Sequence, residues 1–266
     1  MKFSIVTISF NQAEFIERTL LSVISQVGVD IEYIVVDPGS TDGSRDIIER
    51  YRDRIAHIVY EKDKGPADGL NRGFSLATGD VFGYLNSDDT FEPDALRTVA
   101  RYMKAHPEYD VACGHAYATD ADDNKLRRVW SEPYHKLFVA HGAGLQIQPS
   151  TFIRREAFIK SGGFNIENRS NWDGELLADL YLTGARIGVC PAFLSCYRLH
   201  DTSITNTDKM DALIAIWRRR SFEKLMRRPK RPLDNYVATA LRLLKHVKHP
   251  HALAERVTRG PMRKRG

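Results

Sequence analysis

Short apolar runs alternate with helical patterns over the first ninety residues of the chain. Residues 4–9 form the first apolar run, and residues 14–26 follow with apolar side chains three and four positions apart, which is typical of an amphipathic helix. Continuous apolar runs bounded by turn-forming residues predict buried strands. The same reasoning predicts further strands at 31–36, 55–60 and 81–85 and further helices at 44–51 and 69–77.

This alternation predicts an α/β fold built from βαβ units around a central, mainly parallel sheet. Right-handed crossovers would place helices on both faces of that sheet. Ligands of such sheets bind beyond the carboxyl ends of the strands. Two polar clusters, residues 37–42 and 86–89, follow predicted strands and therefore indicate a binding site.

The later part of the chain is organised differently. Residues 113–164 are less periodic and rich in Gly, Gln and aromatic side chains, whereas residues 173–182 again have a helical pattern. From residue 210 onward the chain is helical and basic, and residues 229–232 contain two prolines that would separate tail helices. We therefore expect one α/β domain over residues 1–208 and a helical extension over residues 209–266.

Charge is distributed unevenly between these two parts. The chain of 266 residues has a net charge of +5. Residues 209–266 contain 17 Lys and Arg against 4 Asp and Glu, and the preceding 208 residues contain 22 against 30. An acidic body with a basic extension suggests an anionic partner for the extension, either a membrane or a nucleic acid.

Three features predict a cytoplasmic protein. The three cysteines, Cys113, Cys190 and Cys196, have no paired spacing and are expected to be buried thiols. The apolar start of the chain is interrupted by hydroxyl residues, which favours a strand over a secretory signal. No uncharged apolar stretch is long enough to span a bilayer.

Asp88 and Asp89 carry the sharpest chemical signal. Two adjacent carboxylates at a strand end repel each other unless a cation or hydrogen bonds compensate. A hard divalent ion such as Mg²⁺ or Mn²⁺ takes oxygen ligands and also binds diphosphate oxygens. A helix N-cap ahead of Pro93 explains the same residues without a ligand, so the pair alone leaves both interpretations open.

The other polar segments are weaker evidence when each is taken alone. Asp37 could accept hydrogen bonds from a ribose or a base, but a surface turn before a capped helix explains the 37–43 segment equally well. Residues 64–69 are rich in glycine yet lack the spacing of a P-loop or a dinucleotide fingerprint.

Taken together, these segments resemble family-2 glycosyltransferases of the GT-A fold over roughly residues 3–205. The matching segments, in chain order, are VTISFN (6–11), VVDPGSTDG (35–43), GPADGLNRG (65–73), ATGD (77–80), LNSDD (85–89), PSTFIRR (149–155), GGF (162–164), WDGEL (172–176) and YRLHDTS (197–203).

The resemblance implies a role for each candidate residue. Thr7, Asp37 and Asp68 would line the nucleotide-sugar site, and Asp88 would contact the ribose or the donor sugar. Asp89 would bind the divalent metal, and His200 would reach the metal or the diphosphate. Asp173, which aligns with the first acidic residue of the family's catalytic helix motif, would be the general base.

The family reaction, as the resemblance implies it, is an inverting transfer from a nucleotide sugar to a saccharide or lipid-linked acceptor in the synthesis of cell-surface polysaccharides or glycoconjugates. One departure concerns recognition of the nucleobase: many members have two consecutive aspartates where this chain has Asp37 and Pro38. Proline supplies neither a carboxylate nor a backbone donor, so the sequence does not identify the nucleobase.

Two alternative functions belong to other classes. A sugar-phosphate nucleotidyltransferase would need a basic glycine-rich loop soon after the first strand, where this chain has Asn11, Gln12, Ala13 and Glu14. A nucleic-acid-binding protein would use the basic tail, but its aromatic side chains are few, mainly Trp217, Phe222 and Tyr236. For that tail we favour peripheral association with anionic membranes through residues 210–217 and 236–247.

Overall fold

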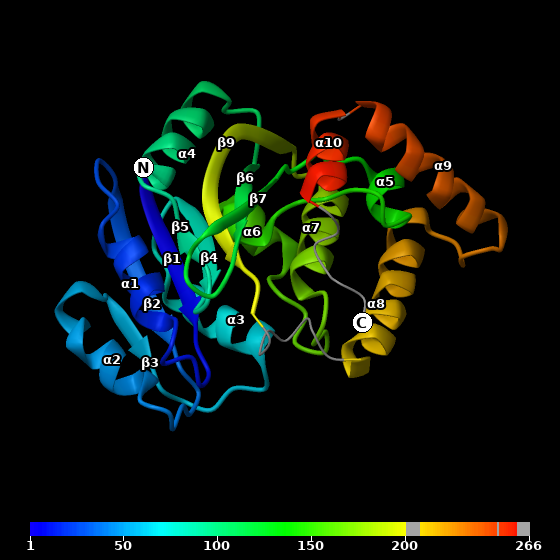
Figure 1. Ribbon diagram of the computed structural model, residues 1–266. Coiled ribbons are helices and arrows are strands. Elements are labelled where there is room, and N and C mark those ends of the chain that lie inside the picture. Colours follow the sequence, from blue (N-terminus) through cyan, green and yellow to red (C-terminus); the bar gives the residue numbers. More distant parts are fainter. Residues whose placement is uncertain (201–207, 249, 260–266) are drawn as a thin grey trace.

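A computed structural model describes residues 1–200, 208–248 and 250–259. Within these residues nine strands form one sheet in the order β3-β2-β1-β4-β8-β6-β9-β5, with β7 paired to β6 (Figure 1). The strands are β1 (Lys2–Ile8), β2 (Asp30–Val36), β3 (His57–Val59), β4 (Val81–Asn86), β5 (Thr90–Phe91), β6 (Val111–Thr119), β7 (Lys125–Val129), β8 (Thr151–Arg154) and β9 (Ile187–Arg198).

The sheet combines a parallel half with a mixed half. β1 runs parallel to both β2 and β4, and β3 runs parallel to β2, as the alternating pattern predicts. β8 is antiparallel to its neighbours β4 and β6, and β9 runs parallel to β6. The parallel half therefore brings the carboxyl ends of β2, β1 and β4 to one edge.

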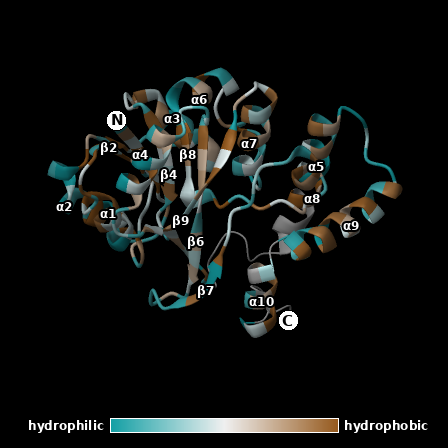
Figure 2. Ribbon diagram, turned by 90° about the horizontal axis from the view of Figure 1, so that it is seen from above, coloured by the Kyte–Doolittle hydropathy of each residue, from teal (hydrophilic) through white to brown (hydrophobic). Residues whose placement is uncertain are grey.

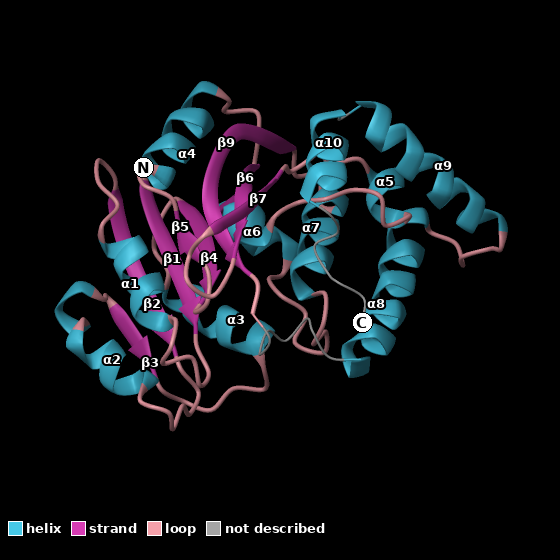
Figure 3. Ribbon diagram, in the orientation of Figure 1, coloured by secondary structure: helices cyan, strands magenta, loops and turns pink. Residues whose placement is uncertain are grey.

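Helices cover both faces of the sheet, and further helices lie beside it (Figure 3). One core lies beneath α1, α2 and α4, and the other beneath α3, α6 and α7. The helices are α1 (Ile16–Ile24), α2 (Ser44–Arg50), α3 (Pro66–Leu76), α4 (Ala95–Ala105), α5 (Lys136–Ala140), α6 (Arg155–Ser161), α7 (Trp172–Leu182), α8 (Asp208–Met226), α9 (Leu233–Lys248) and α10 (Pro250–Arg259).

Packing follows from the spacing of apolar residues. On α1, Ile16, Leu20 and Val23 recur every three or four positions and all are fully buried. On the opposite face, α3 lies directly on β1, because a Cβ at Gly73 would come within 2.6 Å of the Val6 side chain. Glycine at this position thus brings α3 close to the parallel strands.

The extension after residue 208 packs against the body. Phe222 and Leu225 of α8 form a small core with Ala140 and Ala178 from α5 and α7. Trp217 and Phe222 are buried, so neither is available to stack on a nucleic-acid base. Residues 229–232 separate α8 from α9, as predicted, and the 263–265 basic cluster lies outside the described residues.

All three cysteines are buried free thiols, as predicted. None of the described helices has the length and apolar character needed to cross a membrane.

Glu32 on β2 offers a test of how the parallel half is held together. Burial opposes ionisation of this carboxyl, but hydrogen bonds from Ser4, Thr78 and Lys2 outweigh it and lower its pKa from 4.5 to about 2. We expect Glu32→Gln to lower the free energy of unfolding at pH 7 by about 1–3 kcal/mol.

The pH dependence of this loss follows from the lowered pKa. The stabilisation is present above the ordinary pKa of 4.5 and is lost as the pH falls toward 2. Urea unfolding at a series of pH values should therefore show the wild type and the variant converging in acid. The exposed Glu167→Gln is the control, and an equal loss at every pH would contradict this account.

Candidate functional site

Three loops meet at the carboxyl edge of the parallel strands. Ile8 at the end of β1 is in register with Val36 on β2 and with Asn86 on β4. The loops that follow these strands are therefore neighbours. The first two are joined directly, because the Asn11 side chain accepts a hydrogen bond from the Thr41 N–H at 2.9 Å. The strand ends that the sequence singles out thus form one edge.

Asp37 organises the loop that follows β2. Its fully buried carboxylate accepts hydrogen bonds from the backbone N–H groups of Gly39 and Ser40 and forms an ion pair with Arg45 at 3.0 Å. The same guanidinium lies over the Tyr60 ring. The Asp37 oxygens are therefore engaged within their own loop.

Thr7 and Asp68 occupy different environments. The Thr7 hydroxyl lies in the buried interior, 2.9 Å from the hydroxyl of Tyr33. Asp68 lies in the first turn of α3, where it accepts hydrogen bonds from the Lys64 N–H and from Arg72. That turn lies against the ends of β1 and β2, since a Cβ at Gly69 would contact Ile8 and Val36.

Asp88 and His200 form a pair across the edge. The Asp88 carboxylate lies 3.0 Å from His200 Nε2, and the imidazole packs on the Phe15 ring with centroids 4.5 Å apart. His200 follows β9, so two segments more than a hundred residues apart in sequence meet here. The sequence-predicted Asp88 and His200 are thus brought together.

Asp89 is buried beside this pair, with 1% of its surface exposed. One carboxylate oxygen accepts the Arg198 N–H at 3.0 Å, whereas the other, Oδ2, has no hydrogen-bond partner. Burial and the neighbouring Asp88 charge raise the pKa of Asp89 well above its usual value. A cation at Oδ2 would relieve both costs.

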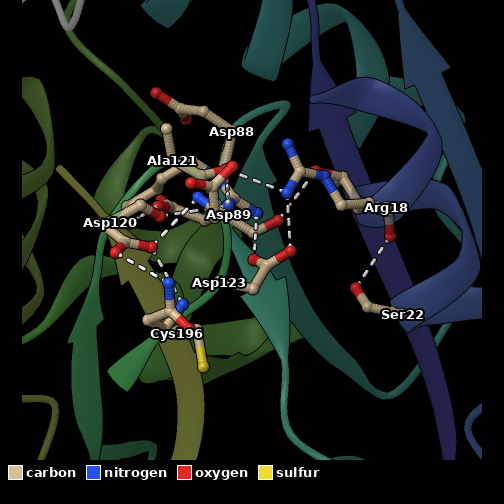
Figure 4. Close-up of polar contacts among 12 residues, drawn as sticks. Arg18, Ser22, Asp88, Asp89, Asp120, Ala121, Asp123 and Cys196 are labelled. Atoms are coloured by element: carbon tan, nitrogen blue, oxygen red, sulfur yellow. Dashed lines mark hydrogen bonds and ion pairs between the residues drawn. The ribbon is translucent and has the colours of Figure 1, made fainter. Parts of the chain in front are cut away.

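Arg198 supports the aspartates from β9. Its side chain, 1% exposed, donates to the Asp88 carbonyl at 2.7 Å and forms an ion pair with Asp123. Asp123 also pairs with Arg18 of α1, and Figure 4 shows the Asp88 carboxylate turned away from this group. Sequence reasoning gave Arg198 no role, although it precedes His200 by two residues.

Asp173 lies on α7, near β4, the strand that Asp88 and Asp89 follow. It lies in the first turn of this helix, and burial raises the pKa of its carboxyl. Burial and the Asp173 charge raise the pKa of Tyr84 on β4, whose ring contacts Trp172. Asp173 therefore lies near Tyr84 on β4. Tyr84 precedes Asp88 by four residues in the sequence.

Further polar residues at this edge were not predicted from sequence. Gln148 joins the Asn86 side chain to the Tyr84 carbonyl. Ser9 Oγ and Gln12 Oε1, in the loop after β1, are buried without hydrogen-bond partners. Their unpaired atoms are the signal for a ligand, and such a signal becomes visible only in three dimensions.

The donor set can be tested against a divalent metal. Among the residues that the structure describes, no three carboxylate, imidazole or thiol groups form a ready-made metal centre. Two aspartates with an unpaired buried oxygen nevertheless suit Mg²⁺ or Mn²⁺, which usually take few protein ligands and complete their shell with water and phosphate. Two cavities of about 730 and 770 Å³ are lined by other residues.

Comparison with known protein families gives one clear match. The model described as glycosyl transferase family 2 matches residues 4–162. A PGL/p-HBAD biosynthesis glycosyltransferase of Mycobacterium bovis is 34% identical over 183 residues, which cover 64% of this chain and 67% of the relative. The succinoglycan biosynthesis protein ExoO of Rhizobium meliloti is 27% identical over 228 residues, 79% of this chain and 65% of that protein.

Other relatives match over shorter regions. The putative teichuronic acid biosynthesis glycosyltransferase TuaG of Bacillus subtilis is 38% identical over 103 residues, 38% of this chain and 41% of TuaG. An uncharacterized glycosyltransferase of Nostoc is 38% identical over 108 residues, which cover 39% of this chain and 33% of that protein. The chain thus spans between a third and two thirds of the length of these relatives.

Solved structures share the fold. S. aureus TarS in complex with UDP-GlcNAc superposes with a TM-score of 0.67 at 18% identity, covering 93% of this chain and 73% of that chain. The mannosyltransferase PcManGT from Pyrobaculum calidifontis, in complex with GDP-Man and Mn²⁺, gives 0.65 at 18% identity, covering 97% and 73%. The arrangement of sheet and helices matches these GT-A structures, as the sequence predicted. The chain is a member of glycosyl transferase family 2 and has the GT-A fold.

Proposed function

We propose that this protein transfers a sugar from a nucleotide-sugar donor to a saccharide or lipid-linked acceptor, with inversion at the anomeric carbon. The observation that carries the proposal is the Asp88–Asp89 pair just after β4, with Asp89 buried and one of its oxygens unpartnered, in a family-2 chain. Relatives named for teichuronic acid and succinoglycan biosynthesis support a role in polysaccharide or glycoconjugate synthesis.

The donor would occupy the edge formed by the ends of β2, β1 and β4. Asp68 and Asp88 are the carboxylates that we place beside the nucleotide sugar. Asp37 and Thr7 would support the nucleotide-sugar site without contacting the donor directly, because the side chain of each already has partners within the fold. In this proposal Asp37 shapes the 37–44 loop that faces the nucleotide.

Mg²⁺ or Mn²⁺ would be held by Asp89 with Asp88 or His200. When bound, such an ion neutralises the negative charge of the departing diphosphate. The complex of PcManGT with GDP-Man and Mn²⁺ supports this choice of cofactor. The unpaired Asp89 Oδ2 is the oxygen that we expect to face the ion.

Asp173 would act as the general base. It accepts the proton of the acceptor hydroxyl while the hydroxyl oxygen attacks the anomeric carbon, and the bond from that carbon to the diphosphate breaks. The raised pKa of Asp173 suits this role, because a stronger base takes a proton from an alcohol more readily. The acceptor would enter between α7 and the end of β4.

We further propose that the protein acts in the cytoplasm. Three unpaired buried cysteines are compatible with a reducing compartment. Nucleotide-sugar donors would have to be available on the same side of the membrane.

The products of the reaction separate this function from its closest rival. With each of several nucleotide sugars and Mn²⁺, and water as the acceptor, we expect slow release of a nucleoside diphosphate and of the sugar with inverted configuration. Phosphorus and proton NMR would identify both products. Pyrophosphate formed from a nucleoside triphosphate and a sugar 1-phosphate would instead indicate a nucleotidyltransferase, and a retained anomer would contradict inversion.

A further inference from the structure

Helix α9 turns its large apolar side chains away from the protein. These side chains are between 37% and 78% exposed, and they recur at spacings of three and four residues, which places them along one side of the helix. We call them the α9 stripe: Leu233, Tyr236, Val237, Leu243, Leu244 and Val247. Figures 1 and 2 both place α9 at the margin of the molecule, and Figure 2 shows hydrophobic residues along it.

The side of α9 that packs on the body carries two charged residues, one small residue and the partly buried Leu241. Asp234 is buried between Arg228 and His141, at 2.6 and 3.4 Å, and Ala238 is buried one turn later. Further along, Lys245 forms an ion pair with Glu132 at 2.9 Å. Turning the stripe inward would break these pairs and leave buried charges alone, so the fold itself fixes the outward orientation.

The segment that contains the stripe is strongly basic. Residues 227–259 contain nine Lys and Arg but only two Asp and Glu. Both acids are engaged, since Asp234 is buried and Glu255 accepts the Arg128 N–H at 2.8 Å. Among the side chains of this region whose exposure the structure describes, the exposed cations are Arg227, Lys230, Arg231, Arg242, Lys248 and Arg259.

We propose that α9 lies in the interfacial layer of an anionic phospholipid membrane, with its stripe among the acyl chains and the cations on lipid phosphates. An amphipathic helix with this division of apolar and basic residues binds such surfaces in plane. On α10, Leu253 and Val257 are also exposed. The inference goes beyond the proposed transfer reaction and does not depend on it.

Two other occupants fit these observations less well. A second copy docked through the same stripe would bring two strongly basic surfaces together, which is unfavourable. Nucleic acid would satisfy the cations but leave the aliphatic stripe exposed, and Trp217 and Phe222 are buried and cannot stack on bases. An anionic bilayer satisfies both the charge and the apolar surface.

Vesicle flotation of the full chain tests the proposal. At low salt we expect binding to vesicles of phosphatidylcholine mixed with phosphatidylglycerol, and little binding to phosphatidylcholine alone. The Leu243→Asp/Val247→Asp variant should bind at least about a hundredfold more weakly, because two apolar anchors are lost and two negative charges gained. Lys248→Gln, which removes an exposed cation beside the stripe, should bind several times more weakly.

Ile159→Asp is the matched control. Ile159 is 62% exposed on α6, outside the extension, so this variant should bind vesicles as the wild type does. Circular dichroism of each variant would establish that the helices are intact. Wild-type protein that ignores anionic vesicles at low salt, or a double aspartate variant that floats with them like the wild type, would overturn the proposal. The proposal would also be overturned if the wild type bound no vesicles but formed a dimer that Leu243→Asp/Val247→Asp dissociates.

Discussion

Asp173→Asn is expected to lower kcat by a factor of about 10²–10⁴, the usual contribution of a general base. Asparagine keeps the size of the side chain but cannot accept a proton at neutral pH. Donor affinity should change little, because Asp173 approaches from α7, on the side that we assign to the acceptor. Steady-state rates and a separate donor-binding measurement would show the two effects.

The pH profile adds a readout that a structural role would not give. Because burial raises the pKa of Asp173, the acid limb of kcat/KM should lie above the value of about 4 expected for an ordinary aspartate. Asp179→Asn, on the same helix, removes an ion pair with Lys224 and serves as the control. It should cost stability and leave turnover within a few fold. Near-wild-type turnover in Asp173→Asn would show that another group is the base.

Asp89→Asn is expected to lower kcat/KM by about 10³-fold, since a metal contributes several kcal/mol of charge stabilisation. The substitution preserves an oxygen ligand but removes the negative charge that would hold the ion. The stabilisation of the fold by donor and Mn²⁺ together should disappear as well. Thermal unfolding therefore gives a readout that does not require turnover.

Asp94→Asn provides a matched control for this variant. Asp94 lies five residues further along, is paired with Arg97 at the surface, and has a backbone φ of 59°, a conformation that asparagine readily adopts. It should retain both activity and the response to Mn²⁺. Loss of activity in Asp94→Asn as well would indicate a general disturbance of the segment after β4.

Sequence patterns identified the parallel half of the fold because each of its elements is locally consistent. β1, β2 and β4 are continuous apolar runs that end in turn-forming residues, and α1 has a clear buried face. The boundaries differ from the expected ones by only a few residues. The carboxyl edge of these strands, and hence the position of Asp37 and Asp88, followed from that order.

The mixed half was harder to predict because its strands lack a simple pattern. β6 contains small residues, with Gly114 under Leu194 and Cys113 in the core, so neither alternation nor a long apolar run marks it. β8 has only four residues and pairs on both sides with strands distant in sequence. Such pairing depends on long-range contacts that a local pattern does not contain.

Partner choice within the site was likewise invisible in the sequence. Asp37 is predicted to line the nucleotide site, and its ion pair with Arg45, a residue from the next helix, could not be read from the sequence. Its role toward the nucleotide stays a prediction. Arg198 looked unremarkable, yet it holds the Asp88 carbonyl and Asp123. The division into residues 1–208 and 209–266 stays a prediction.

The extension shows a further limit of pattern reading. The predicted lipid-binding segments included residues up to Trp217, but Trp217 is buried, and α8 places Phe222 and Leu225 in a core with α5 and α7. On α9 the six apolar residues of the stripe point outward because ion pairs of Asp234 and Lys245 hold the other side. Periodicity locates an apolar face, whereas the contacts of the opposite face decide whether it packs inward.

The most direct test of the central claim is the thermal unfolding midpoint of the wild-type protein with nucleotide sugars, with and without Mn²⁺. A donor at a hundred times its Kd stabilises the native state by about 2.7 kcal/mol, which corresponds to a rise of roughly 5–10 °C for a chain of this size. We predict that at least one nucleotide sugar produces such a rise, and that it requires Mn²⁺ and Asp89. A midpoint that no nucleotide sugar moves, or that moves equally without metal, would contradict the assignment of Asp88 and Asp89 as the metal and diphosphate site.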